Sequence, residues 1–238
     1  MRKLISLFRR EKPHKTVMGK IVMTLAAHGI DTVLDIGGNV GQTGKALREY
    51  GYRGRIISFE PLPEAHALLR RAARGDPGWT VAPRMAIGAA PGIATLRQSA
   101  STDMSSILPA HDALMAAIPG TAMEAKIEAP MRTLADVIVE HCAPEANIFV
   151  KIDTQGYERD VLEGLGPMWE RVTGLQIEMS LLPLYNGETL FDGLIALLKA
   201  RGFEPHLLFD TYFSRELVRQ LQIDGVFYRA DKIKVNGN

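Results

Sequence analysis

The chain contains 238 residues, of which 46% are hydrophobic and 23% are charged, with a formal net charge of +1. This composition is typical of a globular protein of one domain, and the small net charge gives no reason to expect nucleic acid as a partner. No apolar run approaches the ~20 residues of a membrane-spanning helix, and the single Cys142 excludes an internal disulfide and a zinc site built on several cysteines.

The segment that opens the chain, residues 1–10, is basic at both ends with apolar residues between them. Its apolar run is too short for a signal peptide, and it lacks a small-residue cleavage site. Residues 1–15 could make a weak peripheral contact with an anionic membrane surface, although a frayed or packed terminal helix is the simpler interpretation. A lone cysteine fits a reducing compartment, so we expect a cytoplasmic protein.

Residues 16–28 carry apolar side chains at helical spacing and end near Gly29, which predicts a helix leading into the first strand. The buried strand is predicted over 32–36, and residues 42–50 read as the next helix. The glycines of residues 37–41 therefore lie where a strand turns tightly, and a ligand could approach that backbone closely. Their Gly-x-Asn-x-Gly spacing departs from the G-x-G-x-x-G dinucleotide pattern, so the turn alone is a weak signal.

A second strand is predicted over residues 55–61, where Pro61 ends it before the helical pattern of residues 64–74. The strand and helix order is β-α-β-α, which favours parallel strands joined by right-handed crossovers. The carboxyl ends of such strands meet at one edge of the sheet, so we expect Glu60 to lie beside the glycine turn.

The middle of the chain predicts shorter elements. Residues 79–88 read as a strand bent at a proline, followed by a short strand over 93–97. Residues 99–120 have weak periodicity, and such a long irregular connection is either a lid or binding loop or a mobile surface loop. A short strand is predicted over 126–130, and residues 133–140 begin with a capping threonine ahead of an apolar helical face.

Two further strands end in an acid. Residues 147–153 form the second strongest strand pattern and close with Asp153 before a turn and a helix that runs to Leu165. Residues 174–180 repeat this arrangement with Glu178.

The last part of the chain predicts one helix and two strands. An amphipathic helix is expected over 190–201, and short strands over 204–209 and 223–229 complete the sheet, with a partly helical segment between them.

Four segments together resemble the FkbM family of S-adenosylmethionine-dependent methyltransferases: VLDIGGNVG, IISFEP, KIDTQGYERDVLEG and DGVFYR. The resemblance covers roughly residues 31 to 230. Its most specific part is Lys151-Ile152-Asp153 with Gly156 and Glu158. Position 155 is Gln where the family often has Glu.

The resemblance implies an α/β, Rossmann-like class I methyltransferase fold. Its sheet is seven-stranded and mostly parallel, its last strand is antiparallel, and helices cover both faces. The chain then divides into an N-terminal helical extension over 1–30 and a methyltransferase domain over 31–238, with a loop or lid insertion near 99–130. The implied acceptor is a hydroxyl of a glycan, glycolipid or polyketide-type natural product, which is O-methylated. We expect a small-molecule or saccharide acceptor, and the oligomeric state stays open, with a homodimer as one option.

The sulfonium cofactor has a cationic sulfur, an amino-acid end, a ribose diol and an adenine, so its site needs acceptors and close backbone approach. We assign Asp35 and the turn after it to the methionine part, and Glu60 to the ribose hydroxyls, with a solvated strand-end carboxylate as the alternative for Glu60. Ser105 and Ser106 could touch cofactor or acceptor from the lid. The candidate cofactor residues are Asp35, Gly37, Gly38, Asn39, Gly41, Glu60, Pro61, Ala86, Ser105 and Ser106.

Methyl transfer to a hydroxyl needs alignment and a base. Asp153 and Glu178 could take the proton directly or bind a divalent cation that acidifies the acceptor, and the metal version is the less favoured. Lys151 shares a face with Asp153, so it either orients the acceptor or forms a salt bridge with an acid. His206 could join the pair, although a lone histidine is more often a packed or surface residue. Glu158 at a helix start could be favourable through the helix dipole alone.

Two other classes of function remain open at this point. A nicotinamide-dependent oxidoreductase would have a similar sheet, glycine turn and ribose acid, although its third glycine is missing here. A non-catalytic module that binds the cofactor product or a glycan is the second alternative, and it gains weight if Asp153 and Glu178 point away from the cofactor.

Overall fold

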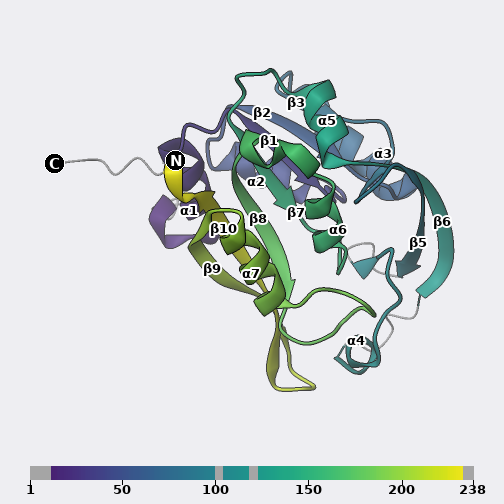
Figure 1. The fold of residues 1–238 in the computed structure, drawn as a ribbon. Coiled ribbons are helices and arrows are strands. Elements are labelled where there is room, and N and C mark those ends of the chain that lie inside the picture. Colours follow the sequence, from purple (N-terminus) through teal and green to yellow (C-terminus); the bar gives the residue numbers. More distant parts are fainter. Residues whose placement is uncertain (1–11, 100–103, 118–122, 233–238) are drawn as a thin grey trace, which may run out of the picture.

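The computed structural model describes residues 12–99, 104–117 and 123–232, which form two sheets and the helices around them (Figure 1). The larger sheet contains β1 (Thr32–Ile36), β2 (Arg55–Phe59), β3 (Trp79–Val81), β7 (Ile148–Ile152), β8 (Val172–Ser180), β9 (Phe203–Ser214) and β10 (Arg219–Arg229). The smaller sheet contains β4 (Ala86–Ile87), β5 (Gly92–Ser99) and β6 (Met123–Arg132). The helices are α1 (Val17–Ala27), α2 (Gln42–Glu49), α3 (Pro63–Ala72), α4 (Asp112–Ala117), α5 (Leu134–His141), α6 (Glu158–Glu163) and α7 (Phe191–Ala200), with the 3-10 turns η1 (Pro13–Lys15), η3 (Gly166–Arg171) and η4 (Ala230–Lys232).

The strands of the larger sheet follow the order β3-β2-β1-β7-β8-β10-β9. The first five of these pair in parallel, and β10 runs antiparallel to both β8 and β9. The predicted seven-stranded, mostly parallel sheet with an antiparallel last strand is therefore confirmed. The strand order reverses at β1, and in such sheets a ligand crevice forms at the carboxyl ends of the strands beside the reversal, here β1 and β7.

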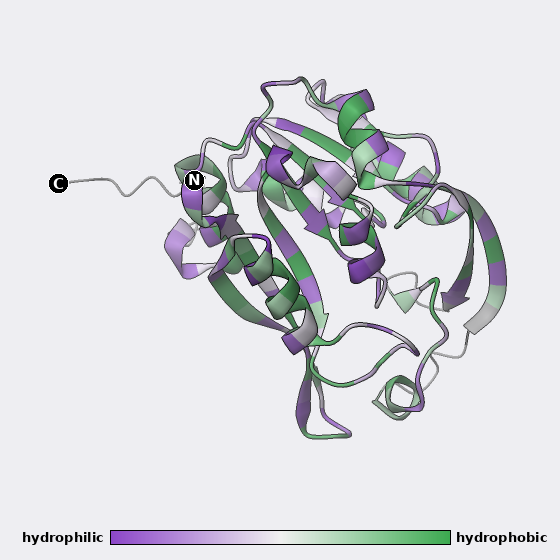
Figure 2. Ribbon diagram, in the orientation of Figure 1, coloured by the Kyte–Doolittle hydropathy of each residue, from purple (hydrophilic) through white to green (hydrophobic). Residues whose placement is uncertain are grey.

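Helices cover both faces of the larger sheet. Side chains of α1, α2 and α3 pack with Val33 and Phe149 on one face, whereas α5, α6, η3 and α7 pack with Leu34 and Val150 on the other. Neighbouring residues of a strand point to opposite faces, and all four of these side chains are buried, so each strand contributes to both cores. In Figure 2, hydrophobic residues run along much of the sheet and hydrophilic residues lie on the outward sides of the helices.

Local signals set the helix starts that the sequence predicts. The Thr16 hydroxyl accepts a hydrogen bond from the amide of Gly19 at 3.1 Å and opens α1. At α5, Thr133 and Asp136 form a capping box, in which each side chain accepts the other residue's amide, at 3.1 and 3.2 Å. The predicted cap at Thr133 is confirmed.

The end of the chain differs from the prediction. Two short strands with a partly helical connection are expected there, whereas β9 and β10 form one long antiparallel hairpin closed by residues 215–218. The expected helix is wrong because pairing with β10 supplies the backbone hydrogen bonds of the end of β9, and this long-range contact has no local signal. The hairpin extends below the sheet in Figure 1.

The insertion between β3 and α5 forms the smaller sheet. β4 pairs in parallel with β6, and β5 pairs antiparallel with β6. The strands expected over 93–97 and 126–130 are confirmed, and both are longer than predicted. The single bent strand expected over 79–88 is wrong, because the chain leaves the larger sheet after β3 and enters the smaller sheet at β4. Part of the expected loop over 99–120 is α4, while residues 100–103 and 118–122 lie outside the described ranges. In Figure 1, α4 and the ends of β5 and β6 extend beyond the carboxyl edge of the larger sheet.

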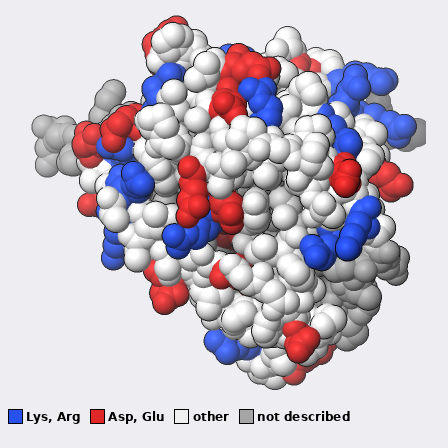
Figure 3. Space-filling model, turned by 45° about the vertical axis from the view of Figure 1, so that its right-hand side comes forward, with Lys and Arg blue, Asp and Glu red and all other residues white. Residues whose placement is uncertain are grey.

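Within the described ranges, no helix is long and apolar enough to cross a membrane. The expected peripheral contact through residues 1–15 falls mostly on residues 1–11, which lie outside those ranges. Acidic and basic side chains are interspersed over the face drawn in Figure 3. Cys142, at the end of α5, is buried and has no disulfide partner in the chain.

Candidate active site

The turn after β1 lies against the ends of two neighbouring strands. The amides of Gly37 and Gly38 both donate to the carbonyl of Phe59 at 3.0 Å, which ties the turn to β2. Gly37 has φ 78°, and a Cβ atom there would lie 1.9 Å from the carbonyl oxygen of Asp153. Only glycine fits at this position, because both the left-handed backbone and the contact with the end of β7 exclude a side chain.

Asp35 lies inside the sheet below this turn. Its Oδ2 accepts a hydrogen bond from the hydroxyl of Ser58 at 2.8 Å, and the Trp79 indole donates to that hydroxyl at 3.0 Å. Burial raises the pKa of Asp35, and Lys151 on the neighbouring strand opposes this shift. Its Oδ1 is buried and accepts no hydrogen bond from the described residues. An unused acceptor beside the glycine turn fits the ammonium of an amino-acid ligand.

Glu60 lies next to the glycine turn, as expected for acids at the ends of neighbouring strands. Its Oε2 accepts the amide of Asn39 at 2.9 Å, and its Oε1 accepts the amide of Leu62 at 2.7 Å. The residue is 4% exposed, so the alternative of a solvated carboxylate is wrong. Burial raises the pKa of Glu60 to about 7, although the two amides work in the opposite direction. Each oxygen keeps a second lone pair, so the carboxylate can still accept two hydroxyls.

Lys151 and Asp153 form an ion pair at the end of β7. The Lys151 ammonium lies 2.9 Å from Oδ2 of Asp153, which confirms the salt bridge as one of the two expected roles of this lysine. Burial lowers the pKa of Lys151, but Asp153 and Asp35 outweigh burial, so the pKa is raised above its ordinary value and the side chain stays charged.

Glu178 near the end of β8 faces the same site. Its Oε2 accepts hydrogen bonds from the side-chain amides of Gln155 at 2.7 Å and Gln222 at 2.8 Å. Its Oε1 accepts none from the residues that the structure describes. Desolvation raises the pKa of Glu178 well above its ordinary value, and the charges of Asp153 and Asp224 raise it further. A carboxylate with an unused oxygen and a raised pKa is suited to accept a proton.

Asp224 on β10 lies opposite Glu178 in the register of the two strands. It accepts the side-chain amide of Gln176 at 2.6 Å. Burial raises its pKa to about 6, and Asp153 contributes in the same direction. The strands β7, β8 and β10 therefore each bring one acid to this part of the sheet edge.

Gln155 joins these acids. Its side-chain nitrogen donates to Oδ1 of Asp153 at 2.8 Å and to Oε2 of Glu178 at 2.7 Å. Its Oε1 accepts the hydroxyl of Tyr185 at 2.8 Å, and its main-chain carbonyl accepts the hydroxyl of Ser106 at 2.6 Å. The end of β7, the end of β8, the loop with Tyr185 and the insertion with Ser106 therefore all contact this one residue.

Glu158 holds the turn that carries Gln155. Its Oε1 accepts the amides of Thr154 at 2.9 Å and Gly156 at 3.2 Å, and also the Thr154 hydroxyl at 3.2 Å. It is buried, and burial raises its pKa to about 7. Its place at the start of α6 agrees with the expected helix-start position, and its hydrogen bonds add a second reason for an acid there.

The other predicted residues are spread around this centre. Ser106 is buried and tied to Gln155, Ser105 is next to it, and Pro61 follows Glu60 directly. Ala86 is buried in the smaller sheet. His206 on the edge strand β9 is not brought to the acids: its ring packs against those of His28 and Tyr228, with centroids 5.2 and 4.9 Å away.

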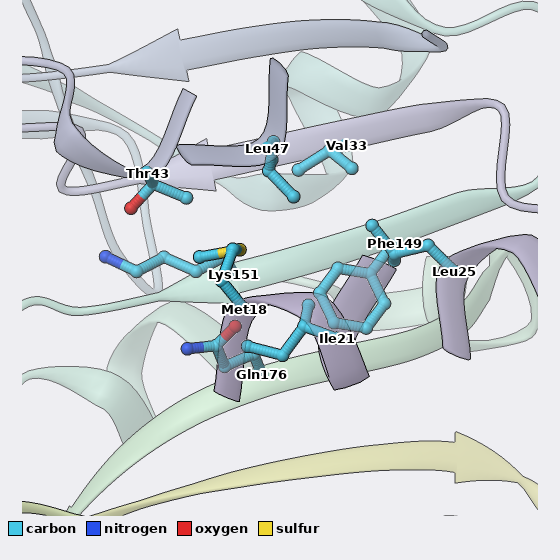
Figure 4. A pocket seen from close by; sticks show the side chains of 9 residues that line it. All are labelled: Met18, Ile21, Leu25, Val33, Thr43, Leu47, Phe149, Lys151 and Gln176. Atoms are coloured by element: carbon cyan, nitrogen blue, oxygen red, sulfur yellow. The ribbon is translucent and has the colours of Figure 1, made fainter. Parts of the chain in front are cut away.

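A small hollow lies between α1, α2 and the sheet (Figure 4). Its polar end is made by Thr43, Lys151 and Gln176, whose polar groups lie on the same side in Figure 4. The lysine ammonium at this end is the one that contacts Asp153. The hollow is lined by Met18, Ile21, Leu25, Val33, Thr43, Leu47, Phe149, Lys151 and Gln176.

The sequence did not indicate Tyr185, Gln222, Asp224 or the bridging role of Gln155. Gln155 and Asp224 lie in the segments KIDTQGYERDVLEG and DGVFYR, but these segments do not show which side chains meet. The contacts span long stretches of the chain: 30 positions from Tyr185 to Gln155, 44 from Gln222 to Glu178 and 48 from Asp224 to Gln176. The departure from Glu at position 155 was the one available signal. Among the described residues, no group of three or more histidines, cysteines or acids is arranged to hold a metal ion.

Comparisons with known proteins agree with this geometry. The family model described as the methyltransferase FkbM domain matches residues 35–205. Magnesium protoporphyrin IX methyltransferase from Synechocystis PCC 6803 with bound SAH is similar in structure, with 10% identity, a TM-score of 0.50, and coverage of 92% of this chain and 84% of that chain. The METTL16 methyltransferase domain has 8% identity, a TM-score of 0.50, and coverage of 89% and 66%. At these identities the likeness concerns the fold. A search of curated proteins finds no match.

Proposed function

The chain belongs to the FkbM family of S-adenosylmethionine-dependent methyltransferases, and from that premise we propose that it methylates a hydroxyl group of a small-molecule or saccharide acceptor. The observation that carries the proposal is Glu178, a carboxylate with a raised pKa and an unused oxygen at the edge where the cofactor crevice is expected. Hydroxyl groups are weak nucleophiles, so their methylation requires such a base.

We assign the cofactor to the carboxyl ends of β1 and β2. The unused Oδ1 of Asp35 and the turn over residues 37–41 would hold the amino-acid end, and Glu60 would accept the two ribose hydroxyls. Pro61, Ala86, Ser105 and Ser106 stay in the proposed wall of this site. When bound, the cofactor supplies a methyl group on a positively charged sulfur.

We assign proton removal to Glu178. Its Oε1 would accept the acceptor's hydroxyl proton while the new C–O bond forms and the C–S bond breaks, so no proton is left on the ether oxygen. Asp153 and Lys151 would position the acceptor, because an ammonium has three hydrogens and its contact with Asp153 leaves Lys151 able to donate to an acceptor oxygen. His206 has no part in this proposal, because it packs against α1 and β10.

The acceptor class is proposed from the family: a hydroxyl of a glycan, glycolipid or polyketide-type natural product. Segment 104–117 would help to select it, because α4 packs on Tyr185 beside the acids. We keep the reducing, cytoplasmic environment and the homodimer as proposals to be tested by localisation and by light scattering.

The first test measures the cofactor. Calorimetry with S-adenosylhomocysteine is expected to give one site per chain, whereas NAD is expected to give no heat of binding. Absence of S-adenosylhomocysteine binding at millimolar ligand, or preferred binding of NAD, would contradict the proposal. An acceptor screen by mass spectrometry, which looks for the mass gain of one methyl group, then identifies the substrate.

The second test measures the base. Glu178→Gln should keep the affinity for S-adenosylhomocysteine and lower kcat by about 10² to 10⁴, because the amide cannot take a proton. The matched control is Glu163→Gln, which makes the same change in a half-exposed pair with Arg159 and should leave kcat unchanged. If Glu178→Gln turns over at the wild-type rate, the base is another group.

A further inference from the structure

The side-chain nitrogen of Gln155 lies between two carboxylates. It is 2.8 Å from Oδ1 of Asp153 and 2.7 Å from Oε2 of Glu178, so one amide donates both of its hydrogens to two different acids. Two carboxylates that face one site repel each other unless a donor or a cation stands between them. In this chain, the donor is an uncharged side chain.

The orientation of this amide is fixed from its other end. Its Oε1 accepts the Tyr185 hydroxyl at 2.8 Å, and burial raises the pKa of that hydroxyl, so the hydroxyl keeps its proton. The same hydroxyl lies 3.3 Å from the carbonyl of Met104, which is the longer of its two contacts. A reversed amide would place its oxygen against both carboxylates, which is unfavourable. The nitrogen therefore faces the acids.

The main chain of Gln155 is also held. Its φ is 55°, in the left-handed region that non-glycine residues rarely adopt. Its carbonyl accepts the hydroxyl of Ser106, which lies in the insertion, and Glu158 binds the amides on both sides of it. Ser106 and Glu158 therefore hold the main chain on both sides of Gln155, which fixes the point from which its side chain starts.

A bridging divalent cation would need the same place. Mg²⁺ and Mn²⁺ sites are built from carboxylate oxygens, and a cation shared by Asp153 and Glu178 would stand between the oxygens that Gln155 now joins. The Lys151 ammonium, 2.9 Å from the other oxygen of Asp153, already balances one negative charge of this pair and repels a second cation.

We propose that Gln155 is the positioning residue of the carboxylate pair, and that its amide, with Lys151, takes the place of a divalent cation between Asp153 and Glu178. The amide holds Oε2 of Glu178 so that Oε1 points to the acceptor. The inference rests on the proposed function for the role of Glu178, while its central test requires no methyl transfer.

The test is a Mn²⁺ titration followed by electron paramagnetic resonance on the wild type and three variants. Gln155→Glu places a third carboxylate between the two acids and should bind Mn²⁺ more than about 10-fold tighter than the wild type. Gln155→Ala removes the amide without adding charge and should also bind more tightly than the wild type. Gln222→Glu is the matched control: it adds the same charge beside Glu178, but the present side chain contacts only that acid, and it should gain less than Gln155→Glu.

Thermal unfolding provides the second readout. Added Mn²⁺ should raise the Tm of Gln155→Glu and leave the wild-type Tm unchanged, and circular dichroism checks that each variant is folded. Wild-type binding as tight as that of Gln155→Glu, or equal gains in Gln155→Glu and Gln222→Glu, would overturn the proposal. So would wild-type turnover that is lost in EDTA and restored by Mn²⁺.

If the wild type binds no S-adenosylhomocysteine and the Mn²⁺ results are as expected, the proposed function fails and the cation replacement stands. If methyl transfer is found and the variants gain no Mn²⁺ affinity, the proposed function stands and the cation replacement fails.

Discussion

Asp153 and Glu178 carry the same functional group, but different partners give them different chemistry. Asp153 has one oxygen on the Lys151 ammonium and the other on Gln155. Glu178 has two amide donors on a single oxygen, and burial, followed by the acids around it, raises its pKa. Lys151 is bound to Asp153, whereas Oε1 of Glu178 has no hydrogen-bond donor among the described residues. These contacts support the proposed division of the pair into a positioning acid, Asp153, and a proton acceptor, Glu178.

A pH dependence follows from Glu60. Its pKa is raised to about 7, so above pH 7 the carboxylate is charged and can accept both ribose hydroxyls, whereas below pH 7 it carries a proton. The affinity for S-adenosylhomocysteine should therefore fall as the pH drops through 7, by up to about tenfold per unit. Calorimetry at pH 5.5, 6.5 and 7.5 measures this.

Glu60→Gln is the control for that experiment. The amide of this variant does not titrate, so its affinity for S-adenosylhomocysteine should be nearly constant from pH 5.5 to 7.5. At pH 7.5 this affinity should be lower than that of the wild type. A wild-type affinity that is also constant would mean that Glu60 does not contact the ribose in its charged form.

The residues of the site could be predicted from sequence only in part. Glu60, Asp153 and Glu178 lie at or near the ends of buried strands. An acid that follows a run of apolar residues can be recognised from the sequence alone. Tyr185 and Gln222 reach the same place through long-range pairing and packing, which no local pattern encodes. The expectation for His206 did not hold because the long hairpin places it on the outer strand, next to α1.

The turn between β7 and α6 is the element on which the site depends. It places Asp153 at the end of the strand, Gln155 in the left-handed region, and Glu158 below as an acceptor for two of its amides. Gly156 has φ 94°, and a Cβ atom there would lie 2.9 Å from the ring of Tyr185. The turn and the loop that carries Tyr185 are therefore packed in direct contact.

Gly156→Ala should destabilise the fold by about 2 to 4 kcal/mol, of which about 1 to 2 kcal/mol is backbone strain and the rest is displacement of the Tyr185 ring. Gly187→Ala is the matched control, because Gly187 has a similar φ of 88° and open space around its Cβ position. Urea unfolding of both variants measures the difference. Equal losses would mean that the ring contact contributes nothing.

At the level of elements, the strands and most helices follow from the sequence because apolar periodicity is a local property. The strands β1, β2 and β7 are short and largely apolar, as expected for strands buried on both faces, whereas β8 carries polar residues among its apolar ones. The full length of the hairpin β9–β10 does not follow from the sequence, because many side chains of β9 are exposed and leave no apolar pattern. The backbone pairing of β9 with β10 extends this strand to Ser214. The smaller sheet likewise depends on β5 and β6 meeting across an insertion.

A contact between α1 and β10 joins the beginning of the described chain to its last strand. The Tyr228 hydroxyl donates to the hydroxyl of Thr24 at 3.0 Å, and the tyrosine ring stacks on His28 with centroids 3.7 Å apart. These residues are about 200 positions apart in the chain. The helix before the first strand therefore belongs to the core, because Ile21 and Leu25 are buried in the same cluster as Tyr228.

Tyr228→Phe should lower the free energy of unfolding by about 1 kcal/mol, because it removes one half-buried hydrogen bond and keeps the ring. Thr24→Val removes the other partner, and a double-mutant cycle isolates the coupling, expected at about 0.5 to 1 kcal/mol. Urea unfolding measures all four proteins. A coupling of zero would mean that the two hydroxyls act independently.

The place of β10 between β8 and β9 has a consequence for synthesis on the ribosome. β9 emerges before β10, yet among the described strands it pairs with β10 alone, and β10 is also the strand that pairs with β8 on that side. A nascent chain that has reached residue 218 therefore exposes an open strand edge of the central sheet, and such edges promote association between chains. β10 leaves the exit tunnel after β9, and it is the strand that joins β9 to the rest of the sheet.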